Sequence, residues 1–173
     1  MSTNKPFMNY PRVYVACLGC YNEGRLNGKW VDAEEYEDYT HKCKHLPCPN
    51  LCFPNHEEYA IHDYDFMPNL GEYPDVEKVV EVAEAVIEHG FSIVNDFIEW
   101  GGDGVTTISD AFVTRLDGWN YNKELGEYLI HEMCLLEIPD EMSYYFDYEA
   151  YGRDMSVNTF YVSDKGNVFW REC

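Results

Sequence analysis

Residues 74–90 carry a periodicity that fits only one kind of local structure. Pro74 and Asp75 suit the first turn of a helix, and Gly90 is typical of the residue that follows a helix end. Between them, two sets of residues recur at helical spacing. The apolar set, expected to be buried, is Val76, Val79, Val80, Ala83, Val86 and Ile87, and the acidic set is Glu77, Glu81, Glu84 and Glu88. The pattern predicts an amphipathic helix to about His89 with one face of carboxylates.

This acidic face has a cost that solubility alone does not explain. Like charges three or four residues apart destabilise a helix by about 0.2–0.5 kcal/mol per pair. Lys78 is the only base between Pro54 and Thr114, against fourteen acids. Carboxylates one turn apart lie about 6 Å apart along the axis, close to two base steps of about 3.4 Å in one DNA strand. Such a row can imitate a row of phosphates; the alternative is a halophilic or merely soluble acidic protein.

The charge of the whole chain narrows the class of partner. The 173 residues carry a formal net charge of −20, far beyond the magnitude of about 2–8 that solubility needs. The charge argues against direct binding of nucleic acid, which requires clustered Lys and Arg, and it indicates a basic partner instead. With 16% aromatic residues the chain is unlike a disordered acidic tail. Neither a membrane span nor a signal peptide is evident. The seven cysteines are an odd number, which fits poorly with a framework of disulfides, so we expect a cytoplasmic protein with reduced thiols.

Three regions follow one another along the chain. Residues 1–65 form a β-rich region with expected strands at 12–17, 29–32 and 59–64, the first two joined through the turn dipeptide Asn27-Gly28. Residues 66–115 are expected to be helical, with helices at 74–89, 91–100 and 106–115. Residues 116–173 are mixed: a helix at 121–133, a helix from Pro139, and a hairpin of strands at 158–163 and 167–171.

The helix expected from Pro139 is part of the stretch 134–154. Pro139 suits the first helical position, and Asp140 and Glu141 suit the positive end of the helix dipole. On a helical period, one face would turn to the core and the opposite face would carry carboxylates and phenols. The core-facing set is Met142, Tyr145, Phe146 and Ala150; the opposite set is Asp140, Tyr144, Asp147 and Tyr151.

A Cys/His-rich loop in the first region has ligand types that suit zinc. Its candidate ligands are His41, Cys43, Cys48 and Cys52, in an irregular spacing. A zinc ion there would be structural; the alternative is a set of unpaired thiols, with no cofactor. Motifs for a nucleophilic serine, a phosphate loop or a dinucleotide site are absent from the sequence, so we do not expect an enzyme.

Three stretches closely resemble the ArdA family of antirestriction proteins. They are YVACLGCYNEGRLNGKWVDA (14–33), EEYAIHDY (57–64) and YFDYEAYGRD (145–154). A further stretch, LLEIP (135–139), lies where that family carries its antirestriction motif. The resemblance spans nearly the whole chain in the right order. The Cys/His loop is a departure from it.

The resemblance implies an elongated α+β protein with a small antiparallel sheet at each end and a helical middle. Family members come from plasmids, transposons and phages, mimic B-form DNA, occupy the DNA-binding groove of type I restriction–modification enzymes, and usually dimerise near the motif. The expected phosphate mimics are Glu77, Glu81, Glu84, Glu88, Glu99, Asp140 and Asp147. The expected motif and homodimer contact is Leu135, Leu136, Glu137, Ile138 and Pro139; the alternative for its apolar residues is intramolecular core.

A second hypothesis remains open at this point. A protein of this charge could be an acidic adaptor or inhibitor of another basic partner, such as a different DNA-binding defence nuclease or a nucleoid protein.

Overall fold

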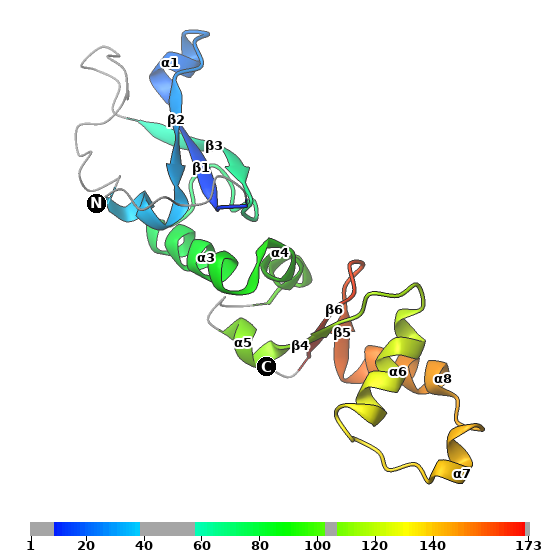
Figure 1. Ribbon diagram of the computed structural model, residues 1–173. Helices are drawn as coiled ribbons and strands as arrows, with labels where there is room; N and C mark the ends of the chain where they lie inside the picture. The colour runs from blue at the N-terminus through cyan, green and yellow to red at the C-terminus, as the bar shows by residue number, and fades with distance from the viewer. Residues whose placement is uncertain (1–8, 39–57, 103–106, 172–173) are drawn as a thin grey trace. The chain divides into compact units, whose positions relative to one another are not determined.

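The computed structural model describes residues 9–38, 58–102 and 107–171 (Figure 1). They form helices and two three-stranded antiparallel sheets, so the α+β fold class is confirmed. Contacts divide the chain into two compact units, Met1–Ile98 and Glu99–Cys173, which we call unit 1 and unit 2. The division into three regions stays a prediction. The described part of the chain includes no helix long and apolar enough to cross a membrane.

The sheet of unit 1 has the strand order β2-β1-β3. β1 (Arg12–Cys17) pairs antiparallel with β2 (Gly28–Asp32) and with β3 (Tyr59–Asp65), close to the strands expected from the sequence. Alternate side chains of β1 point into the core, so Val13 and Val15 are buried there together with Ile61 of β3.

The connection from β1 to β2 differs from the tight hairpin that Asn27-Gly28 indicated. A short helix, α1 (Leu18–Asn22), lies in it, and Gly28 is already a strand residue paired with Ala16. A side chain on Gly28 would meet the Val15 carbonyl oxygen at 2.6 Å and the Tyr14 ring at 2.7 Å. Glycine is needed there for close approach of two strands, and the turn lies elsewhere.

Helices follow the first sheet. The helix α3 (Val76–His89) ends at Gly90, whose φ of 88° only glycine adopts readily, and α4 (Phe91–Trp100) ends at Gly101 with a φ of 94°. α3 packs against η1 (Ala33–Glu35). Its buried face is rotated from the expected one: Ile87 is 48% exposed, and two residues outside the expected set are buried. The buried set is Val79, Val82, Ala83, Ala85 and Val86.

The helix expected at 106–115 is wrong for its second half. Only α5 (Ile108–Ala111) is helical, and β4 (Phe112–Arg115) is a strand of the second sheet. Phe112, Val113 and Thr114 have high β propensity, and pairing with β6 overrides the helical pattern.

Unit 2 has the sheet order β4-β6-β5 with two helices beside it. The expected hairpin is present as β5 (Phe160–Val162) and β6 (Asn167–Trp170), with Gly166 at a φ of 83° in the turn. The helix α6 (Tyr121–His131) packs along α8 (Tyr148–Asn158). Their core with the sheet is Leu116, Leu125, Leu129, Phe160 and Val168.

Two glycines let α6 and α8 approach closely. A methyl group on Gly152 would lie 1.8 Å from the Asn122 carbonyl oxygen, and one on Gly126 would lie 2.0 Å from the Tyr148 carbonyl oxygen. Both contacts are with backbone, which cannot rotate away as a side chain can. The crossing therefore depends on the absence of Cβ atoms.

The single helix expected from Pro139 is also wrong. The structure has α7 (Asp140–Ser143), an interruption, and then α8. The interruption arises because Asp147 is an N-cap: its Oδ1 accepts a hydrogen bond of 2.9 Å from the Ala150 amide and starts a new helix. The expected core face is lost with it, since Tyr145 is 83% exposed, whereas Tyr151 packs on the core of unit 2.

Candidate functional site

The acidic stripe of α3 lies on the surface of unit 1 as expected. Glu77, Glu81, Glu84 and Glu88 are all exposed, because the buried face of the helix lies on its other side. Glu88 has a His89 Nε2 atom 3.8 Å away. Within the described ranges, no ion pair involves Glu77, Glu81 or Glu84. The stripe therefore presents negative charge that the described part of the protein leaves largely uncompensated.

Four exposed basic side chains elsewhere contact acids close to them in sequence. Arg25 pairs with Glu23. The other exposed pairs of this kind are Arg115–Asp117 at 3.3 Å, Lys123–Glu127 at 3.6 Å and Arg153–Asp154 at 3.8 Å. Exposed pairs contribute little to stability. These cations compensate the charge of acids near them in sequence and do not pair with the glutamates of the α3 stripe.

The remaining candidate phosphate mimics belong to unit 2. Glu99 near the end of α4, Asp140 at the start of α7, and Asp147 are all exposed. Asp147 already serves as the N-cap of α8, so one of its oxygens is engaged by the backbone. Of the seven expected phosphate mimics, the four glutamates of α3 are the ones that lie together on one face of one helix.

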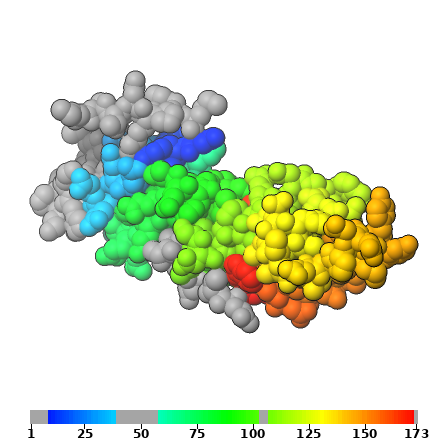
Figure 2. Space-filling view, turned by 60° about the horizontal axis from the view of Figure 1, so that its bottom comes forward, coloured from blue at the N-terminus to red at the C-terminus, as the bar shows by residue number. Residues whose placement is uncertain are grey.

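The segment with the antirestriction motif is an exposed connection between α6 and α8 (Figure 1). Leu135 is 45% exposed and Leu136 is 43% exposed, Glu137 and Pro139 are exposed, and Ile138 is half-buried. Met142, Tyr144 and Tyr145 farther along are exposed as well, with Tyr144 at 97%. In Figure 2 this part of the chain, yellow to orange, lies at the surface. The alternative of an intramolecular core does not hold for Leu135 and Leu136.

The candidate zinc ligands His41, Cys43, Cys48 and Cys52 lie outside the described residues. In the part that is described, no three Cys, His or carboxylate side chains are grouped as a metal site would require. Upstream, Cys17 and Cys20 are buried at the start of α1. Burial raises the pKa of the Cys17 thiol, which favours the protonated form over the thiolate that binds metals.

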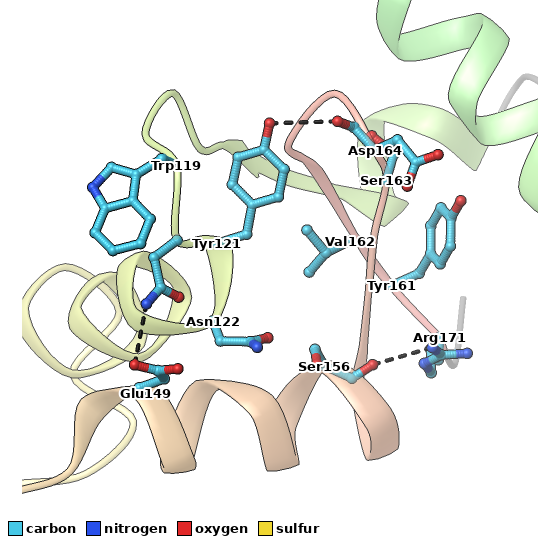
Figure 3. A pocket seen from close by; sticks show the side chains of 11 residues that line it. Trp119, Tyr121, Asn122, Glu149, Ser156, Tyr161, Val162, Ser163, Asp164 and Arg171 are labelled. Atoms are coloured by element: carbon cyan, nitrogen blue, oxygen red, sulfur yellow. Dashed lines mark hydrogen bonds between the residues drawn. The ribbon is translucent and has the colours of Figure 1, made fainter.

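Unit 2 also contains a cavity that the sequence did not indicate. It has a volume of about 610 Å³ and lies among the start of α6, one face of α8 and the β5–β6 hairpin (Figure 3). It is lined by Trp119, Asn120, Tyr121, Asn122, Glu149, Ser156, Tyr161, Val162, Ser163, Asp164 and Arg171. Four of these residues are consecutive, from Trp119 to Asn122, and the other seven lie about thirty or more residues farther along the chain, so no local pattern announces the cavity.

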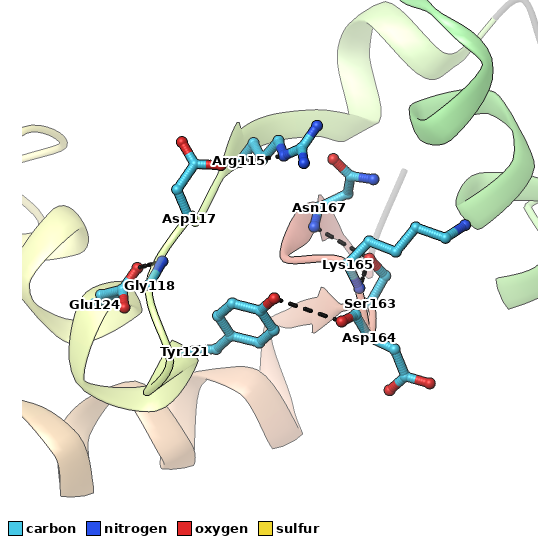
Figure 4. Close-up of polar contacts among 9 residues, drawn as sticks. All are labelled: Arg115, Asp117, Gly118, Tyr121, Glu124, Ser163, Asp164, Lys165 and Asn167. Carbon is cyan, nitrogen blue, oxygen red and sulfur yellow. Dashed lines mark hydrogen bonds and ion pairs between the residues drawn. The ribbon is translucent and has the colours of Figure 1, made fainter.

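The loop that carries Trp119 is held on both sides. The Gly118 amide donates a hydrogen bond of 2.9 Å to Glu124 Oε2 (Figure 4). Asn120 accepts one of 3.2 Å from the Lys123 amide as the N-cap of α6. On the far side of the cavity, Tyr121 donates to the Asp164 carbonyl oxygen at 3.4 Å, which ties α6 to the hairpin turn.

The fold and the composition define a class: an acidic α+β protein with 32 acidic residues against 12 Lys and Arg. The family model described as antirestriction protein (ArdA) matches residues 13–169, nearly the whole chain. The chain belongs to this family, and the resemblance seen in the sequence is confirmed. Membership assigns the protein an antirestriction function and makes restriction enzymes its class of partner. No curated protein matches the chain.

Proposed function

We propose that this protein inhibits a type I restriction–modification enzyme by imitating B-form DNA in the enzyme's DNA-binding groove. The observation that carries the proposal is the exposed row Glu77, Glu81, Glu84 and Glu88 on α3. Residues four apart on a helix are about 6 Å apart along its axis, close to two base steps of about 3.4 Å. The row thus offers negative charge at a spacing that a phosphate-binding groove accepts.

The chemistry of the groove explains why uncompensated charge matters. A DNA-binding groove is lined with Lys and Arg that otherwise attract phosphates and mobile anions. A carboxylate already paired within its own protein would contribute little there. Glu81 and Glu84 have no ion pair among the described residues, so their charge is available to the partner. Their attraction to the groove would weaken as salt screens it, with a Debye length of about 8 Å at physiological ionic strength.

A homodimer through the antirestriction motif forms the second part of the proposal. Leu135 and Leu136 are too exposed to act as core in the monomer, and Met142 and Tyr145 add apolar surface nearby in the sequence. In a symmetric dimer, this apolar segment of one copy can pack against the same segment of the second copy at a two-fold axis, which removes both from water. Dimerisation would double the charged surface offered to a long groove.

A competition assay tests the inhibitor proposal. A type I methyltransferase is bound to fluorescently labelled duplex DNA, and the protein is titrated in at about 50, 150 and 300 mM salt, a range over which phosphate contacts weaken strongly. The proposal expects stoichiometric displacement of the duplex at low salt and progressively weaker displacement as salt increases. No displacement at the lowest salt would refute it.

The dimer needs its own measurement. Analytical ultracentrifugation of the wild type is compared with a Leu135→Ser/Leu136→Ser variant, and Leu26→Ser serves as a control because Leu26 is also exposed, at 68%, but belongs to unit 1. We expect a dimer for the wild type and the control and a monomer for the double variant. A wild-type monomer at concentrations well above those of the competition assay would remove this part of the proposal.

A further inference from the structure

The cavity of unit 2 has two unlike walls (Figure 3). Trp119 and Glu149 lie on one wall, while Tyr161, Asp164 and Arg171 lie on the other. Trp119 is 94% exposed, which is unusual for an indole that could bury a large apolar area. A bulky aromatic ring at the rim of a concave site is typical of residues that dominate protein–protein binding energy.

The carboxylate beside Trp119 is only partly engaged. Glu149 Oε2 accepts a hydrogen bond of 3.1 Å from Asn120 Nδ2, which fixes the position of the group. No Lys, Arg or His pairs with Glu149 among the residues described. Its second oxygen and its negative charge remain available on the cavity wall that the exposed Trp119 also lines. Together they suit a flat cation that can stack on the ring while donating to the carboxylate.

The protein contains the same combination already filled by an arginine. In unit 1 the Arg12 guanidinium lies 5.6 Å from the centre of the Trp30 ring and pairs with Asp65. In unit 2 Arg171 lies 6.0 Å from the centre of the Tyr161 ring but donates hydrogen bonds to the carbonyl oxygens of Phe160 and Ser156, so only the ring half of the combination recurs there. A guanidinium satisfies a ring and a carboxylate together because it is planar and weakly hydrated, whereas the lysine ammonium is a strongly hydrated point charge.

The site is also ordered before any ligand arrives. The hydrogen bonds from Gly118 to Glu124 and from Asn120 to Glu149 hold the loop on either side of Trp119. Little conformational freedom of the loop is left to lose on binding, which favours affinity.

We infer that this cavity receives an arginine side chain from the protein partner, with the guanidinium stacked on Trp119 and hydrogen-bonded to Glu149. A volume of about 610 Å³ exceeds one side chain, so the arginine enters with adjoining residues of its loop. That the partner is a restriction enzyme rests on the proposed function. The arginine specificity rests only on the geometry of unit 2. The cavity thus adds a specific anchor to an attraction that is otherwise spread over many carboxylates.

The specificity is tested first with a peptide probe. The full-length protein, labelled with ¹⁵N, is titrated with acetyl-Gly-Arg-Gly-amide while the indole N–H signals are followed by NMR. The citrulline peptide, equal in shape but uncharged, and the lysine peptide are the comparisons. We expect the Trp119 indole signal to shift with the arginine peptide, and at least fivefold weaker binding of the other two. Equal binding of the citrulline peptide would overturn the inference.

Variants then locate the binding. Trp119→Ala and Glu149→Gln should each lower the affinity for the arginine peptide at least fivefold. Glu132→Gln makes the same charge change at an exposed residue outside the cavity and should leave this affinity unchanged. Glutamine keeps an oxygen for the Asn120 hydrogen bond, and an indole that is 94% exposed contributes little to folding, so both variants should fold normally. Wild-type affinity in Trp119→Ala would overturn the inference.

The methyltransferase competition separates this inference from the proposed function. If the arginine peptide binds at Trp119 but the wild type displaces no duplex, arginine binding in the cavity is supported and the proposal of a restriction-enzyme partner is refuted. If the wild type and Trp119→Ala displace duplex equally well, the cavity does not receive the enzyme's arginine and the inference is overturned. A fivefold or greater loss of displacement in Trp119→Ala, with Glu132→Gln unchanged, supports both.

Discussion

The double substitution Glu81→Gln/Glu84→Gln should make the protein more stable and a poorer inhibitor. These residues occupy the middle of the acidic stripe of α3, where all four glutamates are exposed. Neutralising them removes three adjacent like-charge pairs: 77–81, 81–84 and 84–88. Glutamate and glutamine have similar helix propensities and shapes, so the change is confined to charge.

The size of the gain follows from the helix geometry. Each relieved pair contributes about 0.2–0.5 kcal/mol, so three contribute about 0.6–1.5 kcal/mol. Lys78 lies three residues before Glu81, and losing that attraction can offset one of the three terms. The expected increase in the free energy of unfolding is therefore about 0.4–1 kcal/mol at low salt, and it should shrink at high salt because these are exposed charges.

Binding should change in the opposite direction. Two charges 4 Å apart in water attract by about 1 kcal/mol, so losing two such contacts with the groove costs about 2 kcal/mol, or roughly thirtyfold in affinity. Urea unfolding followed by circular dichroism at 222 nm gives the stability. Displacement of labelled duplex from the methyltransferase gives the affinity.

The control has the same change in net charge. Glu23→Gln/Glu127→Gln removes two carboxylates that pair with Arg25 and Lys123, so it should leave inhibition nearly unchanged and should not stabilise the protein. Unchanged inhibition in Glu81→Gln/Glu84→Gln would refute the role of the stripe. A joint loss of stability and inhibition would show that these glutamates serve the fold.

Three further predictions concern the fold. Gly152→Ala should lower the free energy of unfolding by about 1–3 kcal/mol in urea titrations, because its methyl group would lie 1.8 Å from the Asn122 carbonyl oxygen. Asp154→Ala, at an exposed position on the same helix, is the control and should change the free energy of unfolding little. A Gly152→Ala variant as stable as the wild type would contradict the close crossing of α6 and α8. Asp147→Ala should cost about 1 kcal/mol through loss of the N-cap of α8, which thermal unfolding would detect, whereas Asp147→Ser should keep most of it. Burial raises the pKa of Tyr64 from 10.0 to about 12. The unfolded chain therefore loses this proton first, so stability should fall as pH rises from about 10 to about 12. Tyr64→Phe should show a shallower fall over that range, and an equally steep fall would rule out this tyrosine as a source.

Much of the secondary structure could be predicted from local patterns. The alternation in β1 and the glycines that follow α3 and α4 act within a few residues, so the sequence carries them directly. Predictions failed where a contact distant in sequence decided the outcome. The strand β4 forms because β6 offers it a partner, and the buried face of α3 turns because η1 packs on it.

The candidate site shows the same division. The acidic stripe of α3 follows from helical periodicity alone, and the residues of the antirestriction motif follow from resemblance to the family. The cavity could not be predicted in this way, because Trp119 and Glu149 are thirty residues apart and come to line one cavity only where α6 packs against α8. That packing is close because two glycines have no side chains, and glycine at a helix crossing has no periodic signature.

The sequence by itself determined the charge, the helices that display it and the family of the protein, since these depend on composition, short-range periodicity and motif order. Only the tertiary structure decided which carboxylates the fold engages. It made Asp147 a helix cap, left Glu81 and Glu84 without an ion pair within the described part of the chain, and placed Glu149 in the same cavity as an exposed tryptophan. The physical reason is that a carboxylate's availability depends on its neighbours in space, and these are chosen by packing.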